Sequence, residues 1–303
     1  MTRMLLDAAS LYFRAFFGVP ESVQAPDGTP TNAIRGFLDM TARLVASRKP
    51  NHLLACLDYD WRPAFRVAAV PSYKAHRVAR DGGEEVPAAL ERQVPVLMAV
   101  LDALGIAKVG VAGFEADDII GTATANSAEP VEVVTGDRDL FQVVREEPRV
   151  RVLYIARGVS KLEEIGPDEV AARYGIPGDR YADFAVLRGD PSDGLPGVAG
   201  VGDKTAAALI TRFGSLQGAL EAVGDDGFPA GARRRIEAAA DYLAVAPAVV
   251  AVRADVPMPE HDDRLPLAPA DPEALVELSD RYGLDRSLDR LLSAIKTVAP
   301  EVD

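Results

Sequence analysis

Short apolar runs alternate with longer segments of helical spacing through the first half of the chain. The runs "RMLL", "HLLACL", "AKVGV" and "VEVVT" have the length and composition of buried strands. Between them lie "TNAIRGFLDMTARLVAS", "VPAALERQVPVLMAVLDALG" and "EADDIIGTATANSA", in which apolar residues recur at helical spacing. This alternation predicts an α/β fold with a mostly parallel central sheet flanked by helices.

Acidic residues follow the predicted strands. Asp7, Asp58, Glu115 and Asp137 each lie at or just beyond the carboxyl end of one apolar run. Open α/β sheets bind their ligands at that edge. We therefore expect these four side chains to converge on one rim of the sheet.

The second half of the chain has a helical pattern. Residues 166–190 predict two short helices, and residues 191–220 predict two further helices around a Gly-rich turn. The segment "VPMPEHDDRLPLAPADP" is typical of a surface connection, and "PEALVELSDRYGLDRSLDRLLSAI" predicts a last helical stretch.

Composition and charge narrow the class of protein. About half of the residues are hydrophobic, at 48%, no apolar run is long enough to span a membrane, and no export signal precedes the first strand. The single cysteine, Cys56, lies in an apolar run and is expected to be a core residue. We therefore expect a globular cytoplasmic protein with no membrane partner.

The net charge of −13 argues by itself against a nucleic-acid partner, but its distribution is uneven. Residues 61–80, "WRPAFRVAAVPSYKAHRVAR", contain five Arg and Lys residues and no acid, and "ARRRIE" contains a second basic cluster at Arg233–Arg235. Such clusters are either solvated surface or local patches for a phosphate backbone.

Nine acids could together hold metal ions. Besides the four at strand ends, "GFEADDII", "TGDRDL" and "GDPSDG" supply Asp117, Asp118, Asp139, Asp190 and Asp193. Singly, each is expected to be a surface residue or a helix cap. Gathered at one rim they would repel one another, and Mg²⁺ or Mn²⁺, which prefer carboxylate and water ligands, would relieve that repulsion. The three histidines show no spacing suited to zinc.

The stretch "LPGVAGVGDKTAAALI" has two interpretations. A generic helix–turn–helix connection is one, and a helix–hairpin–helix is the other. In the second, glycines let the backbone approach a phosphate, and a duplex is held by its backbone without sequence reading. Its candidate DNA-binding residues are Gly197, Gly200, Gly202, Lys204 and Thr205. "GVGDKT" lacks the G-K-[ST] step of a nucleotide-binding P-loop.

Six motifs in order carry a resemblance to a known family. They are "LLDAASLYFRAF", "ACLDYDWRPAFR", "SYKAHR", "GFEADDIIGTAT", "VVTGDRDLFQVV" and "LRGDPSDGLPGVAGVGDKTAA". Over nearly the whole chain the sequence resembles the 5′-nuclease (flap endonuclease) superfamily, most of all the N-terminal 5′–3′ exonuclease domain of bacterial DNA polymerase I. The resemblance implies a PIN-like fold with a helical arch and a helix–three-turn–helix element.

The resemblance also implies an organisation and a set of roles. A nuclease core would span 1–172, with the arch at about 62–95. Residues 173–303 would hold the helix–hairpin–helix DNA-binding region and the C-terminal helices, all packed as one globular unit. Asp7, Asp58, Glu115 and Asp117, with Asp118 beside them, would serve a first metal, and Asp137, Asp139, Asp190 and Asp193 a second. Lys74 and Arg77 would contact the scissile phosphate as catalytic residues. Potassium at the helix–hairpin–helix turn is a further candidate ion.

The DNA-binding residues near the N-terminus depart from the family at one position. Where the family commonly has a tyrosine that stacks on the terminal base, this chain has Phe13, with Tyr12 before it. A phenyl ring still stacks on a base. Arg14 matches the family, and Arg66 in the basic stretch is a further expected DNA contact.

The expected function is a free-standing, monomeric, metal-dependent 5′–3′ exonuclease and flap endonuclease for primer removal and DNA repair. Its partner would be DNA with a 5′ flap, a nick or a 5′ end, RNA-primed ends included. Two alternatives remain open at this stage: a PIN-type ribonuclease, and a protein that binds DNA junctions without cleaving them.

Overall fold

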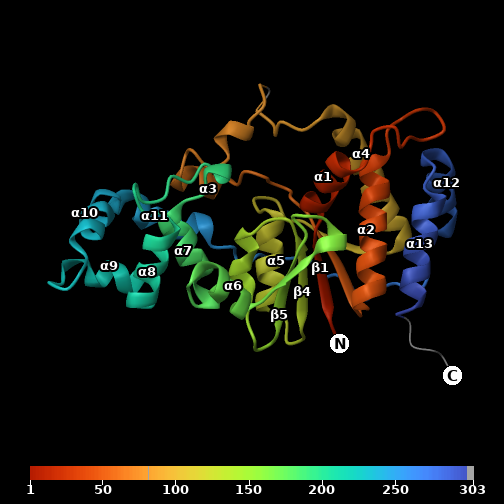
Figure 1. Cartoon of the computed structure of the whole chain (residues 1–303). Helices are drawn as coiled ribbons and strands as arrows, with labels where there is room; N and C mark the ends of the chain where they lie inside the picture. The colour runs from red at the N-terminus through yellow and green to blue at the C-terminus, as the bar shows by residue number, and fades with distance from the viewer. Residues whose placement is uncertain (81, 299–303) are drawn as a thin grey trace.

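A six-stranded sheet forms the centre of the computed structural model, which describes residues 1–80 and 82–298 (Figure 1). The strands are β1 (Arg3–Asp7), β2 (His52–Cys56), β3 (Ala107–Val109), β4 (Val131–Thr135), β5 (Val150–Tyr154) and β6 (Glu163–Ile165). Their order is β3-β2-β1-β4-β5-β6, and all neighbours are parallel except β5 and β6. The predicted α/β fold with a mostly parallel sheet is confirmed.

Two hydrophobic cores cover the two faces of the sheet. Because strand side chains alternate between faces, Leu5 joins one core while Met4 and Leu6 join the other. The core that contains Leu5 includes α5 (Ala116–Ala125), α7 (Tyr181–Arg188) and α11 (Ala240–Val250). The opposite core includes α2 (Asn32–Arg48) and α4 (Ala88–Leu104), with α1 (Ala8–Gly18) packed on α2.

The hairpin helices form a lobe at one end of the molecule, at the left of Figure 1. This lobe contains α8 (Asp203–Phe213), α9 (Leu216–Glu221) and α10 (Ala230–Ala238), with α6 (Pro167–Tyr174) next to the sheet. The helix before the Gly-rich turn is α7, so only one of the two helices expected to flank that turn lies within 191–220. Between α7 and α8 the chain forms a single 3-10 turn, η5 (Pro191–Asp193).

The expected arch spans the top of the sheet, but among its described residues α-helix is found only near its two ends. It begins with α3 (Ala64–Ala69), continues through a 3-10 turn, η1 (Ala75–Arg77), and reaches α4 at Ala88. Pro71, Gly82 and Pro87 interrupt the segment, because proline lacks an amide donor and glycine disfavours a helix interior. Residue 81, inside the expected arch, lies outside the described residues.

The last two helices return to the first half of the chain. Helices α12 (Pro272–Tyr282) and α13 (Asp285–Lys296) pack on α4 and α2 respectively, at the right of Figure 1. Leu288, Leu291 and Ile295 of α13 share a core with Met4 and Leu6 of β1. Within the expected 173–303 region, residues 272–298 therefore pack with the sheet rather than with the hairpin helices, and 299–303 lie outside the described residues.

Helix length and apolarity also bear on membrane insertion. Over the described ranges 1–80 and 82–298, we find no helix with the length and apolar character to cross a bilayer.

Candidate active site

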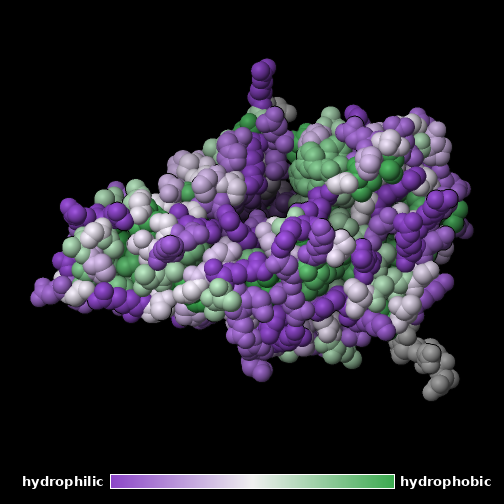
Figure 2. Space-filling model, in the orientation of Figure 1, coloured by the Kyte–Doolittle hydropathy of each residue, from purple (hydrophilic) through white to green (hydrophobic). Residues whose placement is uncertain are grey.

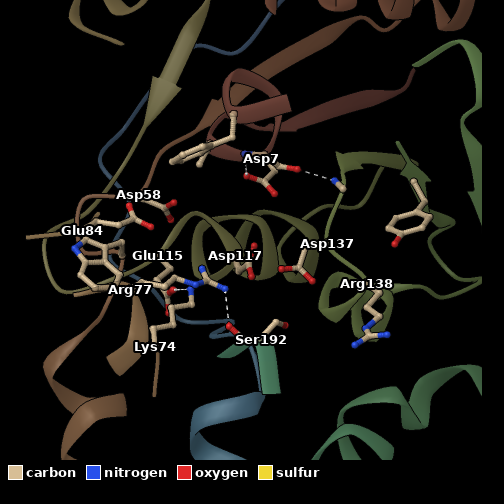
Figure 3. Close-up of a pocket in the computed structure, with 16 residues that line it drawn as sticks. Asp7, Asp58, Lys74, Arg77, Glu84, Glu115, Asp117, Asp137, Arg138 and Ser192 are labelled. Carbon is tan, nitrogen blue, oxygen red and sulfur yellow. Dashed lines mark hydrogen bonds and ion pairs between the residues drawn. The ribbon is translucent and has the colours of Figure 1, made fainter. Parts of the chain in front are cut away.

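The carboxyl ends of the strands carry acidic residues around one cavity. Asp7 is the last residue of β1, and Asp137 lies shortly after β4. These two strands are neighbours at the point where the strand order reverses, which is where open α/β sheets bind ligands. The cavity has a volume of about 420 Å³, and among its lining residues are Asp7, Asp58, Lys74, Arg77, Glu115, Asp117 and Asp137 (Figure 3).

Asp7 is both a helix cap and a wall of the cavity. Its Oδ1 accepts a hydrogen bond from the Ser10 amide at 3.0 Å, and its Oδ2 accepts one from the Thr135 hydroxyl at 2.7 Å. Burial, followed by repulsion from Asp58, raises the pKa of Asp7 from 3.8 to about 7. The fold therefore holds a carboxylate where its charge is poorly compensated by protein groups.

The neighbouring acids share this shortage of positive charge. Burial raises the pKa of Asp117 well above its usual value, and repulsion from Asp7 and Asp137 adds to the effect. Burial and repulsion from Asp137 do the same for the pKa of Asp139. The Oδ1 atom of Asp139 is buried without a hydrogen-bond partner. Cations bound near these groups would lower their pKa values, and one near Asp139 would satisfy that atom.

The donor set fits a hydrated hard cation. Among residues 1–80 and 82–298, no three His, Cys, Asp or Glu side chains stand close enough together to enclose one ion. Mg²⁺ needs no such cage, because it keeps several waters and binds through one or two carboxylates and the phosphates of its substrate. Carboxylates spaced around a cavity of this size suit that mode of binding.

Two of the four acids of the expected second metal site, Asp190 and Asp193, do not line the cavity. Asp190 accepts hydrogen bonds from the Ser192 amide at 2.8 Å and from Arg138 at 3.2 Å. Although burial opposes its charge, these bonds lower the pKa of Asp190. Asp193 accepts a hydrogen bond from Arg77 at 2.7 Å and lines a small adjoining cavity with Asp139. Both acids already have cationic partners.

Lys74 and Arg77 lie at the cavity on the base of the arch (Figure 3). Lys74 has a left-handed backbone, with φ 47°, and its ammonium group pairs with Glu115. Burial opposes the charged form of Lys74, but attraction to Glu115 raises its pKa well above the usual value. Arg77 also donates a hydrogen bond to the Ser192 carbonyl at 2.9 Å. Both expected catalytic cations thus face the acidic rim.

The Gly-rich turn presents an exposed helix N-terminus. Gly202 precedes α8 as its N-cap, and Lys204 and Thr205 lie in the first turn of that helix. Gly197 and Gly200 have positive φ angles of 63° and 76°, which glycine adopts without strain. The Arg235 guanidinium donates a hydrogen bond to the Gly200 carbonyl at 2.8 Å. The structure brings these residues together, but none of them lines the acidic cavity.

Sequence comparisons decide the family. A family model described as "5′-3′ exonuclease, N-terminal resolvase-like domain" matches residues 2–175, and one described as "5′-3′ exonuclease, C-terminal SAM fold" matches residues 176–273. The chain belongs to the 5′–3′ exonuclease family. A "5′-3′ exonuclease" of Streptomyces coelicolor is 56% identical over 299 residues, which cover 96% of this chain and 99% of the relative. The Mycobacterium tuberculosis protein of the same name is 51% identical, with 97% and 98% covered.

A longer relative and two solved structures extend the comparison. "DNA polymerase I" of Mycobacterium leprae is 40% identical over 99% of this chain, which spans 32% of the polymerase. A structure of T5 5′-exonuclease with bound zinc shares the fold, with a TM-score of 0.62, 17% identity, and 99% of this chain and 100% of that chain covered. T5 flap endonuclease in a complex with DNA and metal ions matches with a TM-score of 0.62, 16% identity, and 98% and 99% covered.

Two expected roles in this 5′–3′ exonuclease need correction. Arg66 is only 2% exposed and contacts Asp118 with both terminal nitrogens, at 2.8 and 2.6 Å, so it does not offer its charge to DNA. Asp118 is fully buried and also accepts the backbone amides of Glu115 and Arg253, at 3.2 and 2.9 Å. Asp118 therefore supports the corner before α5 and has no free oxygen facing the cavity.

The aromatic and basic residues of α1 lie next to the acidic rim. Phe13 lines the cavity, and its ring centroid is 5.3 Å from that of Tyr12. A side chain at Gly136 would lie 3.4 Å from Nη2 of Arg14, so this guanidinium lies against the loop after β4. Figure 2 shows the surrounding surface as a hollow with hydrophilic side chains at its edge.

Several residues of the cavity lining were missed by the sequence analysis, among them an aromatic and an acidic side chain. Trp61 and Glu84 line the same cavity, Glu84 from the arch itself. Burial and repulsion from Asp58 raise the pKa of Glu84. Neither residue lies at a strand end, and no spacing in "GGEEVP" separates Glu84 from its exposed neighbour Glu85. The one sequence feature that could have identified Trp61 is its position at the start of the acid-free basic stretch.

Proposed function

We propose that this nuclease hydrolyses phosphodiester bonds at the 5′ ends and flap junctions of duplex DNA, using two or more Mg²⁺ or Mn²⁺ ions. One observation carries the proposal. Acids from neighbouring strand ends and two cations of the arch face the same cavity. Carboxylates that bind metal and cations that bind phosphate are the two components that metal-assisted phosphodiester cleavage requires.

Each group has a distinct part in the reaction. Asp7, Asp58, Asp117 and Asp137 would hold the ions at the cavity, with Asp139, Asp190 and Asp193 behind them. Bound metal supplies a water of lowered pKa and stabilises charge on the attacking and leaving oxygens. Lys74 and Arg77 would stabilise the negative charge that develops on the scissile phosphate. Phe13 and Tyr12 offer ring faces to the terminal bases, and Arg14 offers a positive charge to a neighbouring phosphate.

The duplex would be held at the Gly-rich turn. The free amides at the N-terminus of α8 form an anion site, and Lys204 and Thr205 stand in its first turn. Carbonyl groups of this turn would hold a K⁺ ion, which would supply a positive charge for the phosphate backbone. The contacts involve the sugar–phosphate backbone alone, which suits recognition by shape rather than sequence. We propose that the protein acts as a monomer in the cytoplasm, on nicks, gaps and RNA-primed ends as well as flaps.

Cleavage of matched end-labelled substrates tests the proposal. We expect Mg²⁺- or Mn²⁺-dependent release of the 5′ flap from duplex DNA, no cleavage in EDTA, and no cleavage by Asp117→Asn. Faster cleavage of single-stranded RNA would instead identify a PIN-type ribonuclease. Tight binding of the flap substrate without cleavage in either metal would identify a junction-binding protein.

A further inference from the structure

Both carboxylate oxygens of Glu115 are engaged by side chains of the arch base. Oε2 accepts hydrogen bonds from Arg66 Nη1 at 2.5 Å and from the Tyr73 hydroxyl at 2.8 Å. Oε1 accepts one from the Lys74 ammonium group. Glu115 is only 3% exposed, so water does not replace these partners readily. Both oxygens thus already have hydrogen-bond partners within the protein.

Arg66 is itself fixed from several directions. Its Nε donates to the Val249 carbonyl at 2.9 Å, and its terminal nitrogens hold Asp118 in a bidentate pair. Asp118 in turn accepts the Glu115 amide, so Arg66 and Asp118 together fix the Glu115 backbone and side chain. A planar guanidinium with five N–H donors can serve two carboxylates and a carbonyl at once and still pair with one of them in a bidentate manner.

The position of the Lys74 ammonium group depends on Glu115. The left-handed backbone of Lys74 is held by a hydrogen bond from its amide to the Asp193 carbonyl at 2.9 Å. Its side chain lines the acidic cavity, and within the part of the chain that the structure describes it forms an ion pair with one acid, Glu115. Figure 3 shows Lys74 and Glu115 side by side at the edge of the cavity.

We propose that Glu115 is a positioning residue for Lys74, held in place by Arg66 and Tyr73, and that it is not a direct metal ligand. Oε2 already accepts two hydrogen bonds, and an ion at Oε1 would stand beside the Lys74 ammonium group, whose positive charge repels it. This inference rests on the proposed nuclease function. It leaves the metals at the cavity to Asp7, Asp58, Asp117 and Asp137, and it assigns Glu115 to the phosphate-binding cation.

Mn²⁺ binding without DNA separates a ligand from a positioning residue. In electron paramagnetic resonance titrations, Glu115→Gln is expected to bind as many Mn²⁺ ions as the wild type, with Kd changed by less than about threefold. Asp117→Asn is the matched comparison, and its Mn²⁺ affinity should fall at least about tenfold. Loss of an ion, or an equally weakened affinity, in Glu115→Gln would overturn the proposal.

A double-mutant cycle tests the link between Glu115 and Lys74. Under single-turnover conditions, Glu115→Gln and Lys74→Met should each slow flap cleavage by about 100-fold, with the Kd for DNA changed far less. Since both remove one interaction with the phosphate, the double variant should be at most about threefold slower than the slower single variant. Multiplicative losses would show that the two residues act independently, and would contradict the proposal.

A milder variant guards against misfolding. Tyr73→Phe removes one hydrogen bond to Glu115 and keeps the ring that packs in the core, so it should fold and slow cleavage by about threefold to tenfold. In the Lys74→Met background the same change should have no further effect; a further loss there would contradict the positioning role. Failure of the wild type to cut any substrate would reject the nuclease proposal, while the Mn²⁺ comparison still tests the place of Glu115.

Discussion

At the residue scale, single carboxylates combine structural and chemical roles. Asp7 caps α1 while its charge stands in a buried, acid-rich environment. Asp58 is exposed, yet its Oδ1 accepts the Ala116 amide at the start of α5, at 2.6 Å. Such hydrogen bonds aim the carboxylates and offset part of their mutual repulsion. A bound metal ion would relieve the repulsion that remains between them.

The raised pKa of Asp7 predicts a pH dependence of stability in EDTA. Between its ordinary pKa of 3.8 and about 7, the folded state binds more protons than the unfolded state. The free energy of unfolding therefore falls as pH rises through this interval, and Asp117 and Asp139, with raised pKa values, act in the same direction. We expect the thermal midpoint to be lower at about pH 8 than at about pH 6.

Two controls accompany that measurement. Asp7→Asn should reduce the difference between the two pH values, because its amide does not ionise. Mg²⁺ at about pH 8 should raise the wild-type midpoint, since binding only to the folded state stabilises it. A wild-type midpoint in EDTA that rises towards about pH 8 would contradict the assignment.

The buried ion pairs of Arg66 predict a large effect on stability. Arg66→Met leaves the buried Asp118 without its cationic partner, so the free energy of unfolding should fall by about 3–5 kcal/mol. Arg80→Met, at an exposed position in the same basic stretch, should change it by less than about 0.5 kcal/mol. Urea denaturation of both variants measures the two changes in the free energy of unfolding. Equally small changes would contradict the buried position of Arg66.

At the element scale, strands were predicted where apolar runs were long enough. The runs that became β1, β2, β3 and β4 were recognised from sequence, and with them the rim at which their acids meet. Strands β5 and β6 were not: β6 has only three residues, two of them Glu, at the sheet edge. The last predicted helical stretch divides into α12 and α13 at Gly283, whose φ of 63° ends the first helix.

One glycine of the Gly-rich turn, Gly197, lies where no side chain fits. A Cβ at Gly197 would lie 2.5 Å from the backbone of Arg188 and Gly189, and its φ is positive. Gly197→Ala should therefore distort the hairpin and weaken binding of duplex DNA at least about tenfold in fluorescence anisotropy. Gly224→Ala is the matched control, because a Cβ there has open space. Wild-type DNA affinity in Gly197→Ala would argue against the hairpin as the duplex site.

At the scale of the whole molecule, the C-terminal helices complete the core of the first half. Helix α13 lies along α2, and its Leu291 is fully buried there. The expected division at residue 172 did not anticipate this return, because an amphipathic helix shows that it has an apolar face and not which partner covers it. The acidic cavity and the hairpin consequently belong to different parts of one packed molecule.

Truncation of Leu291 measures how much this packing contributes to the free energy of unfolding. Leu291→Ala should lower the free energy of unfolding by about 2–5 kcal/mol, because it leaves a cavity in a closed core. Leu267→Ala, at a position that is 62% exposed, should have an effect below about 0.5 kcal/mol. Denaturation curves of the two variants provide the test, and a small loss for Leu291→Ala would show that α13 packs loosely.

The sequence by itself was enough to predict the fold class and the acids that lie at the ends of the strands. Parallel strands bring their carboxyl ends to one edge, so Asp7, Asp58, Glu115 and Asp137 could be placed at a common rim from the order of apolar runs alone. The tertiary structure decided which acid meets which cation. Within "GFEADDII", Asp118 accepts hydrogen bonds from Arg66. Glu115 accepts hydrogen bonds from Arg66, Tyr73 and Lys74, while Asp117 faces the cavity. These partners are distant in sequence, and only packing of the arch base against α5 brings them into contact.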